Sequence, residues 1–356
     1  MLLMLTLSEP SYYRMGKRFD DAMRYIGSKN RILDFIDKTI LETYGDYSNA
    51  TVADLFSGTG CVGEMFKKKG ARVISNDYMH FSYAMQISRI KRNKLPRNYQ
   101  KTMEELNVLK GKAGFFFREY TESGTGNRNY FSADNAKKID AICLYLQDKL
   151  AQGEISQDEF YFYKASLIDA VTKVSNTSGT YGSFLKINDN RKYKDIKLEE
   201  LTVTNNDKEN ECFCEDITEV ITHVSGDILY LDPPYNNRQY PPYYHILETV
   251  TLYDDPDIYG KTGRRHYEEM LSPLCMKDKA VAAMVDIIRQ ADFKHCYISY
   301  STDGIMPYKE LCKKLEEYGE VSVFFKDYRR YKANSNGNIE EDKGKLKEII
   351  IYVKKR

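Results

Sequence analysis

The chain has 356 residues, of which 42% are hydrophobic, and its formal net charge is +1. This length accommodates one large domain and a smaller one, and the hydrophobic content excludes a disordered chain. The near-neutral charge argues against a polycation that coats DNA non-specifically, but it allows a basic cleft that is balanced by acidic surface elsewhere.

The cysteines and the apolar segments indicate where in the cell the protein is found. The seven cysteines have no repeated spacing, and Cys212 and Cys214 lack the two-residue gap of a zinc knuckle. We therefore expect reduced thiols, no metal site and a cytoplasmic location. No apolar run approaches the roughly 20 residues of a membrane helix, so no membrane contact is expected. Residues 1–20 are expected to form a loosely held arm without the features of a signal peptide.

The first regular pattern begins near Tyr25. A loop there enters a helix with apolar residues between positions 32 and 40 on one face. A buried strand at 51–56, a glycine-rich turn, a helix at 61–69 and a second strand at 72–76 then follow, and Asp77 comes directly after. This order of elements is that of one βαβ unit.

The pattern breaks between residues 96 and 205, where long polar stretches surround expected helices at 140–150 and 160–174 and a loop at 175–186. Beyond this segment we expect strands at 212–217, 227–232, 295–301 and 321–327, helices at 278–290 and 308–318, and an antiparallel strand at 348–353. The sequence therefore predicts a Rossmann-like α/β domain with a mostly parallel sheet, formed by residues 21–95 and 206–356. Residues 96–205 are predicted to form an inserted, mainly helical domain.

The glycine-rich turn is a candidate cofactor loop. Gly58 and Gly60 permit positive φ angles and a close approach of the backbone to a ligand, and the start of the next helix offers free N–H groups. Asp77 is placed to accept hydrogen bonds from ribose hydroxyls. A simple tight turn explains the glycines equally well. Gly63 also fits the third glycine of a dinucleotide fingerprint, so a dehydrogenase remains a rival at this point.

The segment Asp232-Pro233-Pro234-Tyr235 favours a different chemistry. It leaves the end of a predicted buried strand, which is where α/β proteins bind ligands. The prolines remove two N–H donors and stiffen the loop. A carboxylate, a backbone carbonyl and an aromatic ring together suit a planar amino group, which offers two N–H bonds and a flat face.

With these motifs the chain resembles the amino-methyltransferases, and among them the adenine-N6 methylases that include the Dam-type and D12-class enzymes. The resemblance rests on residues 25–29 (YIGSK), 54–60 (DLFSGTG) and 232–240 (DPPYNNRQY), and on residues 176–182 and 244–249. It extends over nearly the whole chain from about Arg24, and it implies a fold of the kind that binds S-adenosylmethionine.

The resemblance also implies a role for each matching residue. Asp232, Pro233, Pro234 and Tyr235 would hold a flipped-out adenine, whose amino nitrogen attacks the methyl group of the cofactor. The residues that would bind S-adenosylmethionine are Tyr25 and Lys29 at its methionine end, then Asp54, Phe56, Ser57, Gly58, Thr59 and Gly60, with Asp77 at the ribose and Asp216 at the adenine. No metal is required.

Basic and aromatic residues are candidates for contact with DNA. In residues 96–205, which we expect to read the DNA sequence, aromatic residues (Tyr120, Tyr130 and Tyr181) accompany four cations. The candidate cations are Arg118, Arg128, Lys173 and Lys186, followed by Arg238, Lys261 and Arg264 after the catalytic motif. Arg329, Arg330 and Lys332 form a further group. For any single residue, a solvated surface is the competing interpretation.

The sequence therefore predicts a site-specific methyltransferase that acts on adenine N6 in double-stranded DNA, as the modification arm of a restriction-modification system with a cognate endonuclease as functional partner. Asp232, where other amino-methyltransferases carry Ser or Asn, favours adenine over cytosine N4 or a glutamine amide. RNA adenine and a catalytically silent DNA-binding subunit stay open as alternatives. So do the recognised sequence and the choice between monomer and dimer.

Overall fold

A computed structural model describes residues 25–327 and 347–356 of the chain. The expected arm at residues 1–20 and the basic group Arg329, Arg330 and Lys332 lie outside the described residues. Among those described, the helices are too short or too polar to cross a membrane.

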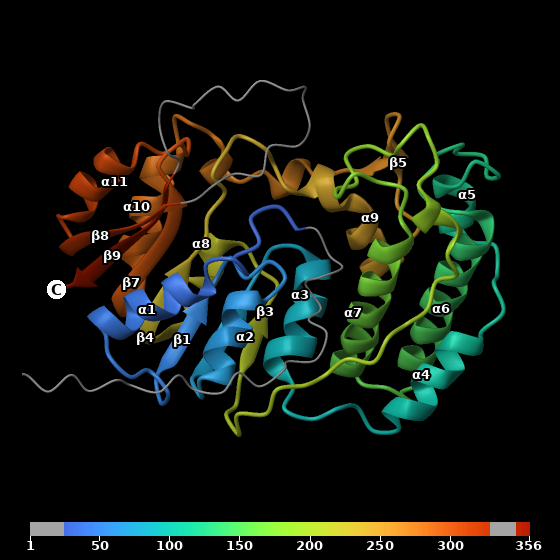
Figure 1. Ribbon diagram of the computed structural model, residues 1–356, viewed down its shortest axis with the longest axis horizontal. Coiled ribbons are helices and arrows are strands. Elements are labelled where there is room, and N and C mark those ends of the chain that lie inside the picture. Colours follow the sequence, from blue (N-terminus) through green and yellow to red (C-terminus); the bar gives the residue numbers. More distant parts are fainter. Residues whose placement is uncertain (1–24, 328–346) are drawn as a thin grey trace, which may run out of the picture.

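The centre of the structure is a seven-stranded sheet in the order β3-β2-β1-β4-β7-β9-β8 (Figure 1). The first five of these strands run parallel, and β9 is antiparallel to both of its neighbours. The predicted α/β fold with a mostly parallel sheet is thereby confirmed. The strands are β1 Thr51–Asp54, β2 Arg72–Asn76, β3 Glu211–Phe213, β4 Ser225–Leu231, β7 Asp292–Ser301, β8 Gly319–Asp327 and β9 Lys347–Lys355.

Helices cover both faces of this sheet, because successive strand residues point to opposite sides. In β4, Ile228 and Tyr230 belong to the core beneath α1 and α2, whereas Leu229 and Leu231 belong to the core beneath α8, α10 and α11. These helices are α1 Leu33–Thr43, α2 Cys61–Lys68, α8 Ile217–Val220, α10 Ala280–Gln290 and α11 Tyr308–Leu315.

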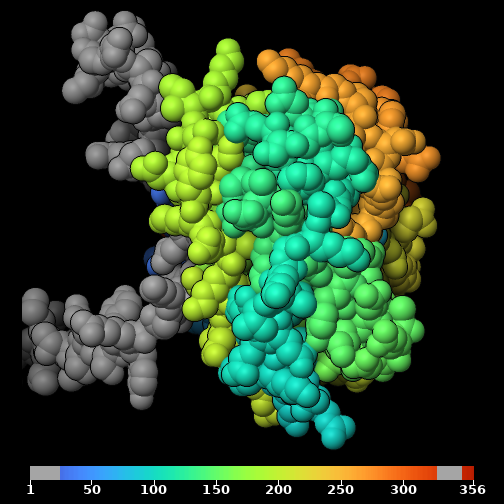
Figure 2. Space-filling view, turned by 90° about the vertical axis from the view of Figure 1, so that its right-hand side faces the viewer, coloured from blue at the N-terminus to red at the C-terminus, as the bar shows by residue number. Residues whose placement is uncertain are grey.

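A second, helical part lies beside the sheet and has a hydrophobic core of its own (Figures 1 and 2). Although α9 comes from residues that follow the catalytic motif, it packs against α3 and α7. A small hairpin of β5 Ile258–Tyr259 and β6 Arg264–Arg265 follows α9. The helices here are α3 His80–Gln86, with a π-helical turn at Ile87–Lys91, α4 Tyr99–Val108, α5 Phe115–Tyr120, α6 Ala133–Ala151, α7 Gln157–Val174 and α9 Pro241–Leu252.

Local capping chemistry accounts for two places where an observed element differs from the expected one. The predicted strand at 212–217 is wrong in its second half, because Asp216 caps α8 by accepting a hydrogen bond from the Thr218 N–H at 2.8 Å. The helix expected at 140–150 begins earlier, at Ala133, where the Ser132 side chain accepts a hydrogen bond from the Asn135 N–H. The antiparallel strand expected at 348–353 is present as β9.

Candidate active site

The glycine-rich turn joins β1 to α2, and its conformation requires glycine. Gly58 and Gly60 have φ angles of 52° and 80°, in the left-handed region that side chains disfavour. A Cβ atom on Gly58 would lie only 2.8 Å from Cε1 of Tyr25. The turn therefore lets the ring of Tyr25 lie directly against the backbone.

Two carboxylates accept hydrogen bonds from the backbone of this turn and of the helix that follows it. Asp54 is 1% exposed, and its Oδ2 accepts a hydrogen bond from the Gly63 N–H at 3.1 Å. Its Oδ1 makes no hydrogen bond of normal geometry among the described residues. Asp77 accepts from the N–H groups of Gly58 at 2.9 Å and Met79 at 3.0 Å. Burial raises the pKa of Asp54 to about 7 and that of Asp77 to about 6.

Asp232, directly after β4, forms an ion pair with a residue far away in the sequence. Its Oδ2 lies 2.8 Å from Nζ of Lys29, which is 5% exposed and also donates to the Gly27 carbonyl at 2.9 Å. The other carboxylate oxygen, Oδ1, makes no hydrogen bond of normal geometry in the described part of the chain, although the Tyr235 hydroxyl lies near enough to lower the pKa of Asp232. Burial raises the pKa of Asp232, and the neighbouring Lys29 opposes this shift.

The ring of Tyr235 is held by the adjoining strands. Its hydroxyl lies 3.2 Å from Oγ of Ser299 on β7 and donates to Oε2 of Glu348 on β9, also at 3.2 Å. The ring meets Tyr300 edge-on with a centroid distance of 4.9 Å, and Nζ of Lys29 lies 4.7 Å from its centroid. Tyr235 is thus fixed by its surroundings beside the Lys29–Asp232 pair.

Most of the predicted site residues line one of two neighbouring cavities that share Tyr25, Phe56 and Asp232. A cleft of roughly 850 Å³, open to solvent, contains Tyr25, Phe56, Asp77, Asp216, Asp232 and Pro234 in its walls. A smaller cavity contains Tyr25, Lys29, Asp54, Phe56, Ser57, Gly58, Thr59 and Asp232. Gly60, Pro233 and Tyr235 line neither cavity. Chain segments about 200 residues apart therefore meet at the carboxyl ends of β1, β2 and β4.

Helix α9 supplies site residues that the sequence analysis missed. Tyr244 stacks on Tyr25 at a centroid distance of 5.0 Å, and its hydroxyl accepts a hydrogen bond from the Ile26 N–H at 2.7 Å. Tyr240, just before the helix, also lines the cleft. Pro241 and Pro242, followed by a largely apolar run, form a helix-start signal that could have located α9.

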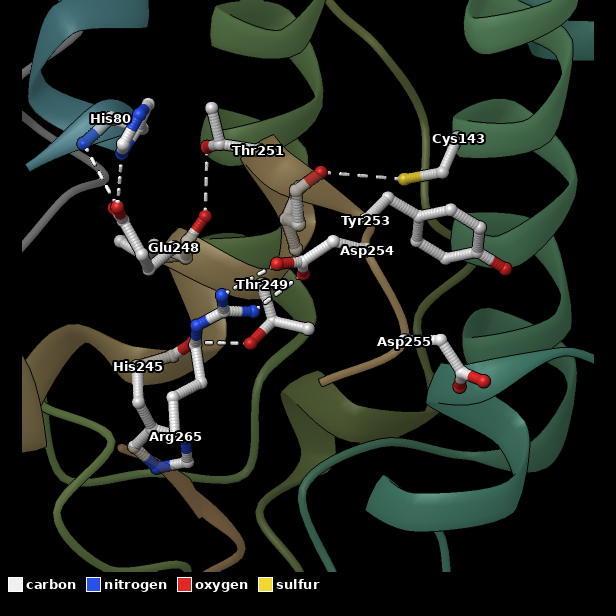
Figure 3. Close-up of polar contacts among 12 residues, drawn as sticks. His80, Cys143, His245, Glu248, Thr249, Thr251, Tyr253, Asp254, Asp255 and Arg265 are labelled. Carbon is white, nitrogen blue, oxygen red and sulfur yellow. Dashed lines mark hydrogen bonds and ion pairs between the residues drawn. The ribbon is translucent and has the colours of Figure 1, made fainter. Parts of the chain in front are cut away.

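Farther along α9, Glu248 connects this helix to the wall of the cleft (Figure 3). Its side chain is 4% exposed and accepts hydrogen bonds from the backbone N–H groups of His80 at 3.0 Å and Phe81 at 3.1 Å, at the start of α3. The His80 ring lies 2.7 Å from the same carboxylate, and this hydrogen bond raises the pKa of His80. Glu248 therefore caps the helix that begins just after the cleft residues Asp77 and Met79.

Three of the predicted DNA-binding cations are engaged within the protein. Arg118 pairs with Asp255 at 2.5 Å and Glu119 at 3.0 Å. Arg128 is mostly buried, pairs with Glu119 at 3.0 Å and donates to the Gly260 carbonyl in the β5–β6 hairpin. Lys173 pairs with carboxylates at 2.6 and 2.9 Å, those of Asp169 and Glu199.

The other predicted cations are more accessible. Lys186, Arg238 and Lys261 are exposed. The guanidinium carbon of Arg238 lies 5.9 Å from the ring centroid of Tyr243, and that of Arg264 lies 5.2 Å from the ring of Tyr259.

The aromatic part of the DNA-contact prediction is wrong. Tyr120, Tyr130 and Tyr181 are buried in the core of the helical part. The hydroxyls of Tyr120 and Tyr130 donate to the carbonyls of Gly263 and Tyr181. Sequence position alone did not distinguish a ring that packs in the core from a ring that faces solvent.

The sequence of this chain is similar to a known protein family and to several known proteins. A model of the D12 class N6 adenine-specific DNA methyltransferases matches residues 25–312. Modification methylase LlaI of Lactococcus lactis subsp. lactis is 38% identical over 349 residues, which are 94% of this chain and 55% of the relative. Type II methyltransferase M.FokI of Planomicrobium okeanokoites is 39% identical over 347 residues, 94% of this chain and 53% of the relative.

A shorter relative is matched nearly in full. Type II methyltransferase M.NlaIII of Neisseria lactamica is 34% identical over 317 residues, which cover 89% of this chain and 94% of the relative. The chain thus spans about half the length of the first two relatives and most of the third. A solved S-adenosylmethionine-dependent methyltransferase from Agrobacterium tumefaciens aligns at 11% identity over 93% of this chain and 64% of its own, with a TM-score of 0.33, too weak to support an argument.

Proposed function

Because the chain belongs to the D12 class N6 adenine-specific DNA methyltransferase family, we propose that it transfers a methyl group from S-adenosylmethionine to N6 of an adenine in double-stranded DNA. The family match does not favour cytosine N4, RNA adenine or a silent subunit. The named relatives are modification methylases and type II methyltransferases, which supports a place in a restriction-modification system.

One observation carries the chemical part of the proposal. At the carboxyl end of β4, Asp232 presents a buried oxygen, Oδ1, that makes no hydrogen bond of normal geometry among the described residues, while Lys29 holds Oδ2. An unpaired buried acceptor is costly unless a ligand satisfies it. An amino group of a base supplies the missing donor.

The residues present fit S-adenosylmethionine. The cleft is lined by aromatic side chains such as Phe56 and Tyr240 together with a few carboxylates, which is the usual composition of a small-molecule site. Oδ1 of Asp54 and Oγ of Ser57 are buried and make no hydrogen bond of normal geometry within the described residues, although the Ser57 hydroxyl lies near enough to lower the pKa of Asp54. Both residues line the small cavity, which therefore contains acceptors for a cationic amino-acid group. Asp77 and Asp216 line the larger cleft, and the family resemblance assigns them ribose and adenine contacts. When bound, S-adenosylmethionine supplies an electrophilic methyl group.

The protein's own part is to bind and orient the target nitrogen. In a duplex the adenine amino group is out of reach, so the base must leave the stack before Asp232 can meet it. Oδ1 of Asp232 accepts a hydrogen bond from one N–H of the amino group, and the Pro233 carbonyl is our candidate acceptor for the other N–H. These bonds draw on the amino protons and make the nitrogen lone pair more available. Positioning and electrostatics supply most of the catalysis.

Lys29 keeps Asp232 in its accepting form. Burial favours the protonated carboxyl, which is a weaker acceptor than the carboxylate and carries an O–H donor that can face the amino group. The ammonium group of Lys29 at 2.8 Å favours the carboxylate instead. We therefore propose that Lys29 keeps Asp232 ionised, in addition to its expected contact with the methionine end of the cofactor.

The test is methylation-sensitive sequencing of DNA from cells that express the protein, compared with its Asp232→Asn variant. The wild-type protein should leave N6-methyladenine at one recurring sequence, whereas Asp232→Asn should leave none and still bind S-adenosylmethionine by calorimetry. Asp286→Asn, a half-exposed carboxylate on α10, is the matched control. Methylation by Asp232→Asn at the wild-type level, or a modified base other than adenine, would overturn the proposal.

A further inference from the structure

The loop that follows α7 carries an unusually exposed aliphatic side chain. Ile187 is 86% exposed, the most exposed large hydrophobic residue in the described chain. We call residues 186–194 the projecting loop. Single exposed apolar residues are common on protein surfaces, so exposure alone assigns no role to Ile187.

The base of the projecting loop is firmly held. Asn176 is fully buried, and its side-chain amide donates to the carbonyls of Asn129 at 2.9 Å and Leu185 at 3.0 Å. Its Oδ1 accepts from the Asp189 N–H at 2.9 Å. These bonds fix the chain on both sides of Ile187, at Leu185 and at Asp189.

The loop is also closed upon itself. Oδ1 of Asn188 accepts from the Asn129 amide at 2.7 Å and from Nζ of Lys192 at 3.2 Å, while the Asn188 amide donates to the Tyr193 hydroxyl at 2.6 Å. Lys192 is 3% exposed and pairs with Glu122 at 2.8 Å. Asn188 and Tyr193 are exposed, but the network is anchored on the buried side chains of Asn129 and Lys192. It therefore restrains the backbone on both sides of Ile187.

The segment that leads into the projecting loop is connected to the catalytic side of the molecule through Tyr181. The Tyr181 N–H donates to the Tyr243 carbonyl at 2.8 Å at the start of α9, and Arg238 of the catalytic loop lies over the Tyr243 ring. Figure 1 shows the light-green chain after α7 at the same edge as the β5–β6 hairpin. Figure 2 shows this yellow-green segment and the orange hairpin region on either side of the helices.

The charge around Ile187 indicates the kind of partner. Residues 186–197 contain five cations, namely Lys186, Arg191, Lys192, Lys194 and Lys197, against two carboxylates, Asp189 and Asp195. Of these, Lys186, Lys194 and Lys197 are exposed. An apolar tip among cations matches a nucleic acid, whose phosphates attract the cations and whose stacked bases accept an apolar wedge.

We propose that Ile187 enters the DNA base stack and fills the space that the target adenine leaves when it moves to Asp232. This inference rests on the proposed function, because it requires a flipped base. Unstacking a paired base costs a few kcal/mol, and a wedge that occupies the gap slows the return of the base. The wedge matters most where the target adenine has a pairing partner to return to.

The test compares two duplexes that carry the recognition sequence found by sequencing. One is fully paired, and the other has an abasic site opposite the target adenine. Single-turnover methylation is measured for wild type, Ile187→Ala and Val108→Ala. Val108 is 78% exposed at the end of α4, at the opposite edge of the helical part (Figure 1), and is the matched control.

We expect Ile187→Ala to lose roughly ten- to one-hundredfold in rate on the paired duplex, because pairing and stacking oppose flipping by a few kcal/mol. On the abasic duplex its rate should approach that of the wild type, and Val108→Ala should match the wild type on both. A normal rate of Ile187→Ala on the paired duplex, or an equal loss on both duplexes, would overturn the wedge. Wild-type protein that methylates neither duplex would instead overturn the proposed function.

Discussion

Removing the charge of Asp54 should stabilise the protein at alkaline pH and remove cofactor binding at the same time. The carboxyl group is buried at the end of β1, one oxygen makes no hydrogen bond of normal geometry among the described residues, and its pKa is raised to about 7 from an ordinary value of 3.8. The folded state therefore holds this proton more tightly than the unfolded state does. As pH rises from about 4 to about 7, the group lowers the free energy of unfolding.

The size of this effect follows from the two pKa values. Their difference corresponds to roughly 4 kcal/mol once Asp54 is fully ionised, at about 1.4 kcal/mol for each factor of ten. Asp54→Asn carries no titrating group. Its advantage in unfolding free energy over the wild type should therefore be small near pH 4 and grow to several kcal/mol near pH 8.

Urea unfolding of the cofactor-free protein at a series of pH values measures this difference directly. Asp286→Asn is the control, because that carboxylate is half exposed on α10. Calorimetry should show that Asp54→Asn no longer binds S-adenosylmethionine, since the variant lacks the buried carboxylate of the small cavity. A difference in unfolding free energy that does not vary with pH would refute the reasoning about the buried charge.

Three further substitutions probe the site. Lys29→Met should raise the pKa of Asp232 by removing its ion-pair partner, so the acid limb of the pH–rate profile should move to higher pH; an unmoved limb contradicts this. Gly58→Ala should weaken S-adenosylmethionine binding at least tenfold in calorimetry, because the new Cβ meets a tyrosine ring. The positive φ angle adds about 1–2 kcal/mol of backbone strain. Gly153→Ala is the control: Gly153 also has a positive φ angle but lies in open space, so this variant should bind S-adenosylmethionine normally. Glu248→Gln loses one of the two acceptors at the start of α3, so the free energy of unfolding should fall by roughly 1–3 kcal/mol. The KM for the cofactor should rise while kcat stays the same. An unchanged KM would argue against a positioning role for Glu248.

The parts of the fold that sequence predicted well depend on neighbouring residues. The strand-turn-helix-strand unit from Thr51 to Asn76 was located closely, because a short apolar run, a glycine-rich turn and Gly70 at the end of the helix are local signals. The end of β3 was misplaced because the capping role of Asp216 became visible only in the structure.

The parts of the site that sequence did not predict depend on contacts across the fold. The pairing of Lys29 with Asp232 joins residues 203 positions apart, and no spacing rule relates them. Arg128 was expected at a DNA surface, but it is mostly buried and holds the β5–β6 hairpin. A sequence shows that a residue is basic, whereas the carboxylates around it are set by the tertiary structure.

The position of β1 beside β4 has a consequence for how the protein folds. Val52 pairs with Ile228, so the central strands meet only after helices α3 to α7 of the helical part have been synthesised. Contacts of such separation form slowly, because a long loop must close first. Helices α6 and α7 are neighbours in the sequence and pack against each other, so their contacts can form sooner. On the ribosome, helices α4 to α7 should therefore be able to pack before the cleft exists, whereas α9 joins them only after β4 has emerged, and cofactor binding should begin no earlier than that.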